Sequence, residues 1–408
     1  MMKKGSLEVV CWFIIDLITI VLACLFSSHR ANLWAVAIGV VGFSLYSIFK
    51  SYKTPGYLPS TLAIPENNRK PVYDYIRIIA VIFIISVHIL GPDWENTKGM
   101  ENTIIYHVLN YIRCFTGVSG DCLFIMISGA LLLGFKEESV LTFYRKRLTR
   151  VAIPLIIYYL FYLWQYDAMG QLSIWQIAKK IITADYTGAN VYHFWLIYII
   201  VSLYVLVPFL RYMLKDMPYK VLTSLIAVMF TYYLLTRIII NESAMPMHFS
   251  FWLMMFIMGY WYGREETRKY DSIAIVVGVA AAVVFGIYLK LRTGLPDDLD
   301  GEYPFLIPAS IGIMGIFFML QEKLKNIYLI RVISKYSYGI ILVHMLIINF
   351  AVKLYIYKYF SALYYQGMGF VLIVLATLIG SLLMAYLIDN IFVNPITALL
   401  GRDFKQRR

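Results

Sequence analysis

The sequence predicts an all-α, polytopic transmembrane helix bundle, with a ten-helix core preceded by two extra N-terminal helices. Of the 408 residues, 61% are hydrophobic and only 15% are charged. The apolar residues gather in runs of membrane-spanning length, and short polar or basic segments separate the runs. A water-soluble chain of this length has no means of burying so much apolar surface, whereas lipid accepts it.

The membrane spans follow from the length of the apolar runs. Roughly 20 apolar residues cross the hydrocarbon core of a bilayer as a helix. The runs of that kind cover residues 9–28, 32–49, 73–91, 114–134, 151–167, 193–213, 220–240, 248–263, 271–289, 304–320, 337–352 and 367–394. Twelve spans place both termini on the same side of the membrane.

The distribution of basic residues orients the bundle. Of the 36 Lys and Arg, 25 fall on the side of the termini and 9 on the other side. Cytoplasmic loops are the ones enriched in Lys and Arg, so we expect both termini in the cytoplasm. The same bias accounts for the net charge of +12 without a nucleic-acid partner.

The Pro- and Asn-rich stretch 51–70 is typical of a linker and divides the chain. We therefore predict a two-helix extension (1–50), a cytoplasmic linker (51–70), a transmembrane core (71–398) and a basic cytoplasmic tail (399–408), without an appended soluble catalytic domain. Within the core, Gln171–Ala184 alternates apolar and polar residues at helical spacing. This pattern predicts an amphipathic helix on the outer membrane surface.

Several common chemistries are not favoured. The four cysteines (Cys11, Cys24, Cys114 and Cys122) lie in apolar runs without CxxC spacing, which is typical of small buried side chains. The chain has no HExxH, GxSxG or Walker-type motif, so zinc hydrolase, serine hydrolase and ATPase functions are not favoured. We expect no metal cofactor.

The first core span carries ionisable residues at membrane depth, where each is costly. Arg77 and His88 are eleven residues apart, so they lie within about 20° of each other on a helix and about 16 Å apart along it. Asp74 shares this face. Taken singly, Asp74 fits a helix N-cap, Arg77 an interfacial anchor and His88 an outer-interface residue. The shared face favours a functional stripe instead.

The next spans add further candidates. Asp121 is a carboxylate inside an apolar run, and it either pairs with a cation such as His88 or Arg77 or acts as a proton site. Ser128-Gly129 fits plain small-residue helix packing. His193 opens a span among aromatic residues, as an interfacial belt would, and His344 lies near mid-membrane, where a histidine needs a partner.

Three arginines, Arg145, Arg147 and Arg150, precede the third core span. Positive-inside charge explains such a cluster in about half of cases. The functional interpretation is a phosphate clamp, because Arg147 and Arg150 are three residues apart on a helix and project guanidinium forks to one side. That pair suits a polyanionic cytoplasmic donor.

The ordered motifs resemble the acyltransferase-3 family of integral membrane acyltransferases. They are Asp74-x-x-Arg77 with His88, Phe124-x-x-x-Ser128-Gly129, Tyr144-Arg-Lys-Arg147-x-x-Arg150-x-x-x-Pro154, His193-Phe-Trp195 with Tyr204 and Pro208, and Ser337-Tyr338-Gly339 with His344. They cover roughly residues 71–398. The chain departs from the family pattern in its two leading helices, in the Gly120-Asp121 pair and in having no SGNH-type domain.

The resemblance implies transfer of an acyl group, usually acetyl, from cytoplasmic acyl-CoA to a hydroxyl of a cell-envelope glycan or its lipid-linked precursor. It also implies the bacterial cytoplasmic membrane as the location. His88 matches the family's essential histidine, Arg77 the arginine of the same helix, and Arg147 and Arg150 the pair associated with the CoA donor. We therefore predict His88, Arg77 and Asp121 as catalytic, Arg145, Arg147 and Arg150 as donor-binding, and His193 and His344 as substrate-binding residues.

The chemistry agrees with this assignment, because a neutral imidazole removes the proton of a sugar hydroxyl and makes it nucleophilic. His88 as general base and His88 as transient acyl carrier remain alternatives. The main rival function is a transporter or flippase of an envelope precursor, since twelve spans and intramembrane charges suit carriers. A membrane sensor is a third option.

Overall fold

The computed structural model describes residues 70–91, 102–134, 138–165, 172–183, 191–236, 245–291, 304–349, 368–394 and 396–397. Every regular element in these ranges is a helix. Contacts divide the chain into one unit of Asn68–Met384 and a second of Met1–Asn67 with Ala385–Arg408. The predicted N-terminal spans, 9–28 and 32–49, and Cys11 and Cys24 lie outside the described residues.

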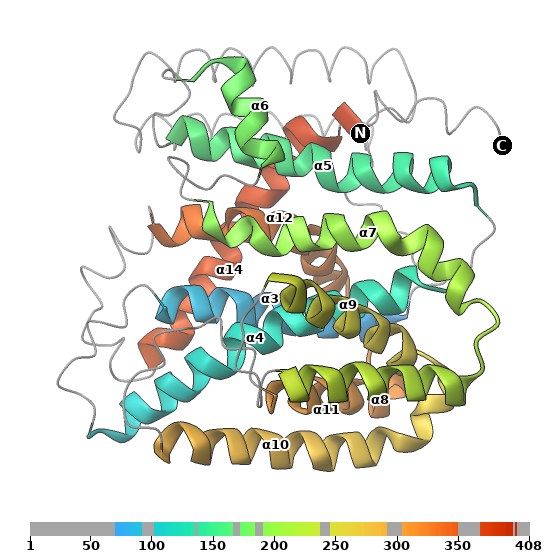
Figure 1. Cartoon of the computed structure of the whole chain (residues 1–408). Helices are drawn as coiled ribbons and strands as arrows, with labels where there is room; N and C mark the ends of the chain where they lie inside the picture. The colour runs from blue at the N-terminus through green and yellow to red at the C-terminus, as the bar shows by residue number, and fades with distance from the viewer. Residues whose placement is uncertain are drawn as a thin grey trace, which may run out of the picture. The chain divides into compact units, whose positions relative to one another are not determined.

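Ten apolar helices correspond in order to the ten predicted core spans (Figure 1). They are α3 (Pro71–Leu90), α4 (Ile104–Leu132), α5 (Val140–Gln165), α7 (Trp195–Leu214), α8 (Tyr219–Leu235), α9 (Met245–Tyr262), α10 (Asp271–Leu291), α11 (Leu306–Met319), α12 (Tyr328–Ile347) and α14 (Met368–Ile388). A 3₁₀ turn, Tyr192–Phe194, leads into α7, and a π-helical turn, Asp389–Val393, follows α14.

Among the described residues, seven helical stretches are long and apolar enough to cross a membrane. The apolar parts of α8, α9 and α11 are shorter, at Tyr219–Leu235, Phe251–Tyr262 and Leu306–Met319. The chain is therefore an all-α, polytopic membrane protein, as the sequence predicted.

Three helices begin well before the apolar run that predicted their membrane span. Helix α4 begins at Ile104 instead of residue 114, α5 at Val140 instead of 151, and α12 at Tyr328 instead of 337. Hydropathy marks where a helix is apolar, whereas backbone hydrogen bonding continues through polar residues beyond the membrane. Arg145, Arg147 and Arg150 therefore lie on the first three turns of α5.

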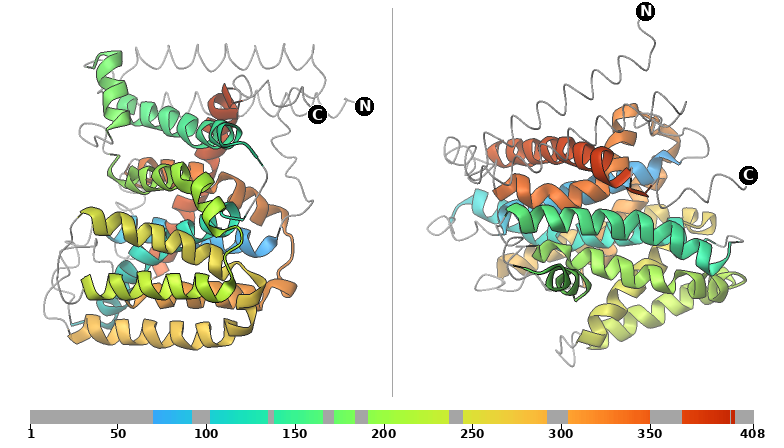
Figure 2. Two further views of the ribbon diagram at one scale, coloured as in Figure 1. Left: turned by 45° about the vertical axis from the view of Figure 1, so that its right-hand side comes forward. Right: turned by 90° about the horizontal axis from the view of Figure 1, so that it is seen from above.

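Helix α3 lies in the interior of its unit, with α4 and α12 as its main neighbours (Figure 1). Most of its residues are buried, including polar Asp74 and Ser86. Helix α10 (gold in Figure 2) lies at the edge, packs along α11 and leaves most of its apolar surface exposed. An exposed apolar helix is expected where the surroundings are lipid.

Helices α4 and α9 touch backbone to backbone through two glycines. A Cβ on Gly129 would lie 1.8 Å from the carbonyl oxygen of Phe256, and one on Gly259 would lie 1.9 Å from that of Met126. Only glycine permits so close a crossing, which confirms the small-residue interpretation of Ser128-Gly129.

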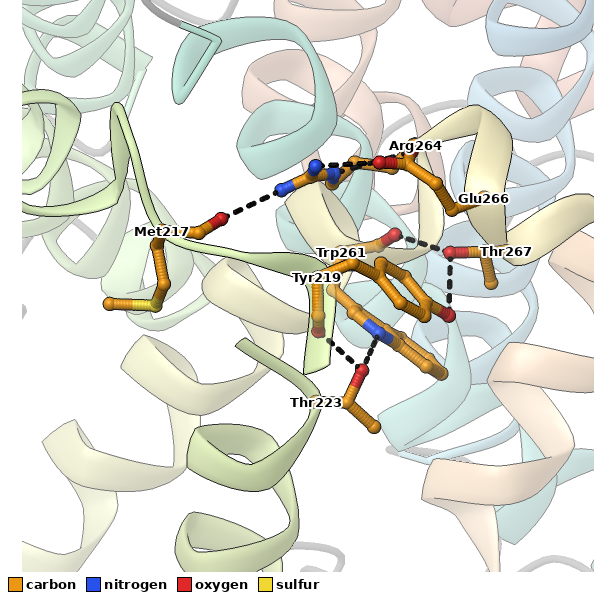
Figure 3. A network of polar contacts seen from close by, with 7 residues as sticks. All are labelled: Met217, Tyr219, Thr223, Trp261, Arg264, Glu266 and Thr267. Atoms are coloured by element: carbon orange, nitrogen blue, oxygen red, sulfur yellow. Dashed lines mark hydrogen bonds and ion pairs between the residues drawn. The ribbon is translucent and has the colours of Figure 1, made fainter. Parts of the chain in front are cut away.

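Hydrogen bonds connect the start of α8 to the end of α9 (Figure 3). The Trp261 indole N–H donates to Thr223 Oγ1 over 2.9 Å. Arg264 forms an ion pair of 2.7 Å with Glu266 and also donates to the Met217 carbonyl. These contacts satisfy polar groups at the turn between helices.

The predicted amphipathic segment forms α6 (Ile174–Ile182), which opens with a capping box between Ser173 and Gln176. None of its residues is buried, and Trp175 is 80% exposed. Tyr198 of α7 donates a 2.7 Å hydrogen bond to the Ile181 carbonyl at its end. The helix is confirmed, while its place on the outer membrane surface stays a prediction.

Candidate active site

Three histidines from separate elements meet in the bundle, and we call them the histidine cluster: His88 near the end of α3, His193 in the turn before α7, and His344 near the end of α12. The ring centroids of His88 and His344 are 5.0 Å apart, and those of His193 and His344 are 5.2 Å apart. The His88 and His193 centroids are separated by 6.2 Å. The structure thus brings together three residues that the sequence predicted separately.

The members of the cluster differ in exposure. His344 has no exposed surface and His193 is 3% exposed, whereas His88 is partly exposed. Tyr192 is 38% exposed, and the centroid of its ring lies 5.9 Å from that of the His88 ring. His88 is therefore the histidine that an incoming molecule meets first.

Hydrogen bonds determine the tautomers of the two buried rings. His344 Nδ1 lies 2.7 Å from the Ile341 carbonyl, and a carbonyl only accepts, so this nitrogen carries the hydrogen. His193 Nε2 lies 3.3 Å from the Leu342 carbonyl and 3.1 Å from the Tyr162 hydroxyl, which itself donates to Leu342. His193 Nε2 is thus the donor. Each ring keeps its lone pair on the other nitrogen.

A second polar group lies toward the end at which α3, α5 and α12 begin, and we call it the basic cluster: Asp74, Arg77, Ser334, Tyr204 and Arg147. Arg77 donates a 2.8 Å hydrogen bond to Ser334, which donates over 2.5 Å to Asp74. The Arg77 guanidinium is also 3.7 Å from Asp74. Asp74 is not an N-cap, since Lys70 holds that position, and its carboxylate instead holds the α3–α12 contact.

Tyr204 of α7 connects this group to α5. Its hydroxyl is within hydrogen-bonding reach of Ser128, and Arg77, Arg147 and Arg150 are close enough to act on it electrostatically. Arg147 is half-buried, with its guanidinium 5.9 Å from the Phe143 ring centroid, while Arg145 and Arg150 are exposed. Several guanidinium groups thus act electrostatically on one phenol, an arrangement suited to binding anionic oxygens.

The two clusters lie on the same helices at different depths. Arg77 and His88 are eleven residues apart on α3, which is about 16 Å along the axis. His193 and Tyr204 are also eleven apart, with α7 running in the opposite direction. The two clusters therefore lie at two depths of the bundle, about 16 Å apart. We call these depths the basic level and the histidine level.

A family model described as an acyltransferase domain matches residues 71–389. The match covers most of the chain and every residue of both clusters. The chain belongs to the acyltransferase-3 family. Comparisons with curated proteins and with solved structures gave no match. The protein is thus a multi-pass membrane acyltransferase.

Asp121 of this acyltransferase is buried in α4 at a level between the two clusters. Its neighbour Gly120 packs against Phe83 and the Ala80 carbonyl of α3. Within the described ranges, no ion pair joins Asp121 to His88 or Arg77. Its catalytic role stays a prediction, as do the roles of the other predicted site residues.

Sequence reasoning missed Tyr162 and Ser334. Tyr162 is one of several tyrosines in an apolar stretch of α5, and nothing in its spacing distinguishes it. Ser334 is a polar residue three positions before Ser337, which is only a weak signal in the sequence. Its role becomes apparent from its hydrogen bond to Asp74. Among the residues that the structure describes, no group of three or more His, Cys, Asp or Glu is arranged to hold a metal ion.

Proposed function

We propose that this membrane acyltransferase is an O-acetyltransferase of the bacterial cytoplasmic membrane, with both termini in the cytoplasm. It moves an acetyl group from cytoplasmic acetyl-CoA to a hydroxyl of a cell-envelope glycan or of its lipid-linked precursor. The observation that carries the proposal is the arrangement of a basic level and a histidine level in one family-matched bundle.

The basic level suits the donor. Acyl-CoA is long, with phosphates toward one end and a thioester at the other. Arg145, Arg147 and Arg150 on the first turns of α5 offer guanidinium forks for the phosphates, with Arg77 and Tyr204 behind them. A donor held there points its thioester along the bundle toward the histidine level, about 16 Å away.

The histidine level suits the chemistry. His88 takes the proton of the acceptor hydroxyl, the hydroxyl oxygen forms a bond to the thioester carbonyl, and the carbon–sulfur bond breaks. The proton then passes to the departing thiolate, which leaves as CoA. In the alternative route His88 carries the acetyl group transiently before the acceptor attacks.

Arg77 acts on the donor side in this scheme. Its guanidinium is bonded to Ser334 at the basic level. A group about 16 Å along α3 from His88 is too far to contact the carbonyl that reacts there. Its loss should therefore weaken donor binding more than it slows the chemical step.

The test compares O-acetyl esters of envelope glycans in cells that make wild type, His88→Ala or Arg150→Ala at matched membrane levels. We expect a loss of at least tenfold in both variants, because one lacks the base and the other a donor contact. His107→Ala is the matched control, since His107 is an exposed histidine outside both clusters.

The proposal would be overturned if wild type produced no O-acetyl ester, or if both variants produced as much of it as wild type. Movement of an envelope precursor that does not depend on acyl-CoA would favour the transporter or flippase function instead.

A further inference from the structure

The feature that the proposed reaction leaves unused is the pair of buried, neutral histidines behind His88. His344 Nε2 and His193 Nδ1 are both buried and have no hydrogen-bond partner among the described residues. A buried polar atom without a partner is costly, so one in a native site calls for an explanation. Both atoms are lone-pair nitrogens in the tautomers that their carbonyl contacts impose.

Neither buried ring is placed to contact a substrate. His344 has no exposed surface and His193 is 3% exposed. Part of the surface of His88 is exposed, while its ring lies 5.0 Å from that of His344 at an interplanar angle of 34°. His193 lies farther from His88, at 6.2 Å, and nearly perpendicular to it. His344 is thus the better placed partner for His88.

We propose that His344 is a positioning residue whose Nε2 accepts a hydrogen bond from one ring nitrogen of His88 while the other nitrogen faces the acceptor hydroxyl. This inference rests on the proposed acyl transfer with His88 as base. Two imidazoles joined by an N–H···N bond of about 2.9 Å have centroids roughly 5 Å apart, so a small rotation of the His88 ring completes the bond. Catalytic hydrogen bonds often tighten only when substrate is bound.

The proton balance explains the arrangement. His88 begins neutral, with its hydrogen on the nitrogen that faces His344 and its lone pair toward the acceptor. When it takes the acceptor's proton it becomes an imidazolium, and the His344 lone pair stabilises that charge through the existing hydrogen bond. The proton leaves with the thiolate, and His344 keeps its own hydrogen on Nδ1, which donates to the Ile341 carbonyl throughout. This is the orienting role that a carboxylate has in a Ser-His-Asp triad, here given to a neutral imidazole.

Other groups around the cluster complete this environment. The titratable side chains whose rings contact His88 in the described elements are those of His344, His193 and Tyr192. Tyr162 holds His193 and so limits the movement of the ring beside His344. His344, His193 and Tyr192 are uncharged in the arrangement described, so the His88 imidazolium has no counter-ion within the histidine cluster. Its charge is therefore stabilised by hydrogen bonding.

The experiment measures acetyl transfer by purified protein in lipid nanodiscs, with acetyl-CoA and an isolated envelope glycan fraction as substrates. His344→Leu removes the acceptor nitrogen, and we expect kcat to fall about 100-fold while KM for both substrates stays within twofold. His344→Gln keeps an oxygen to accept from His88 and an amide to donate to Ile341, so it should restore at least a tenth of the wild-type kcat. His107→Leu, the same change at an exposed histidine, should have no effect.

An unchanged kcat in His344→Leu would overturn the inference. If in addition the KM for the acceptor rose in that variant, His344 would be a substrate-binding residue. The inference would also fail if His344→Gln were as slow as His344→Leu while both variants kept the wild-type melting temperature. Absence of transfer by wild type would instead overturn the proposed function, so the two failures are distinguishable.

Discussion

At the residue scale, several charged side chains of the acyltransferase meet an oppositely charged or polar partner within the described residues. Asp74 and Arg77, both costly in an apolar bundle, share Ser334 and face each other across 3.7 Å. Glu138, just before α5, binds Arg211 of α7 and Lys146 of α5. Arg211 also donates to the Leu132 carbonyl at the end of α4, so this side chain joins three helices.

Glu138 makes the stability of this junction dependent on pH. Burial by itself raises the pKa of Glu138, but hydrogen bonds from Arg211 and Lys146 outweigh it and bring the pKa below the ordinary value. The stabilisation is therefore fully present above the unfolded-state pKa of about 4.3 and is lost as the pH falls through the lower folded-state value.

We expect acidification from pH 7 to about pH 3.5 to lower the melting temperature of wild type more than that of Glu138→Gln, measured in detergent by tryptophan fluorescence. Glu322→Gln, at an exposed carboxylate, is the control. Acidification should lower its melting temperature by as much as that of wild type. Equal acid sensitivity of wild type and Glu138→Gln would show that the ion pairs do not stabilise the fold.

At the element scale, the helices are positioned by small residues where they cross and by side-chain to carbonyl hydrogen bonds where they run together. Tyr144 of α5 donates to the Val205 carbonyl of α7, and Tyr338 of α12 donates to the Val151 carbonyl of α5. In an apolar bundle such bonds add to van der Waals packing, which is the main source of helix association in lipid.

The α4–α9 crossing gives the sharpest prediction at this scale. Gly129→Ala should lower the free energy of unfolding by about 3 kcal/mol, because its Cβ meets the backbone oxygen of Phe256 and the two helices must separate. Gly134→Ala is the matched control, since nothing lies within 4 Å of a Cβ there. Thermal unfolding in detergent measures both, and equal stability of the two variants would contradict the close crossing.

At the scale of the whole molecule, the proposed acyl transfer depends on two levels, and each level is built from several helices. The basic level draws on α3, α5, α7 and α12, and the histidine level on α3, α12 and the turn before α7. In the proposed reaction, the separation of about 16 Å suits a long donor whose anionic end and reactive end are recognised separately.

This separation predicts how donor truncation changes the effect of a mutation. Arg147→Ala should raise KM for acetyl-CoA at least tenfold, since a charge-assisted hydrogen bond contributes about 1.5–3 kcal/mol. With the acetyl thioester of N-acetylcysteamine, which has no phosphates, wild type and Arg147→Ala should transfer at the same rate. A penalty that persists with the truncated donor would place Arg147 outside phosphate binding.

Much of the fold could be predicted because lipid imposes a simple rule on sequence. Backbone groups in a bilayer must be hydrogen-bonded within the segment, so each long apolar run becomes a helix. The starts of α4, α5 and α12 could not be predicted from hydropathy, since polar residues such as Arg113, Arg147 and Arg331 separate each start from the long apolar run of its helix. The boundaries of the linker, core and tail stay predictions.

For the site, the sequence by itself determined which residues are costly in a membrane: His88, Arg77, Asp121, His193 and His344 stood out because each ionisable side chain requires compensation there. The family match to residues 71–389 agrees with the ordered motifs that carry them. Periodicity also placed Arg77 and His88 on one face of one helix, because the helical repeat is a local property.

Only the tertiary structure decided how these residues are grouped. Contacts such as Ser334 with Asp74 join residues 260 apart in the chain, and the tautomers of His193 and His344 depend on carbonyls that the fold brings to them. Sequence spacing says nothing about such pairs, because the packing of helices against one another determines which faces meet.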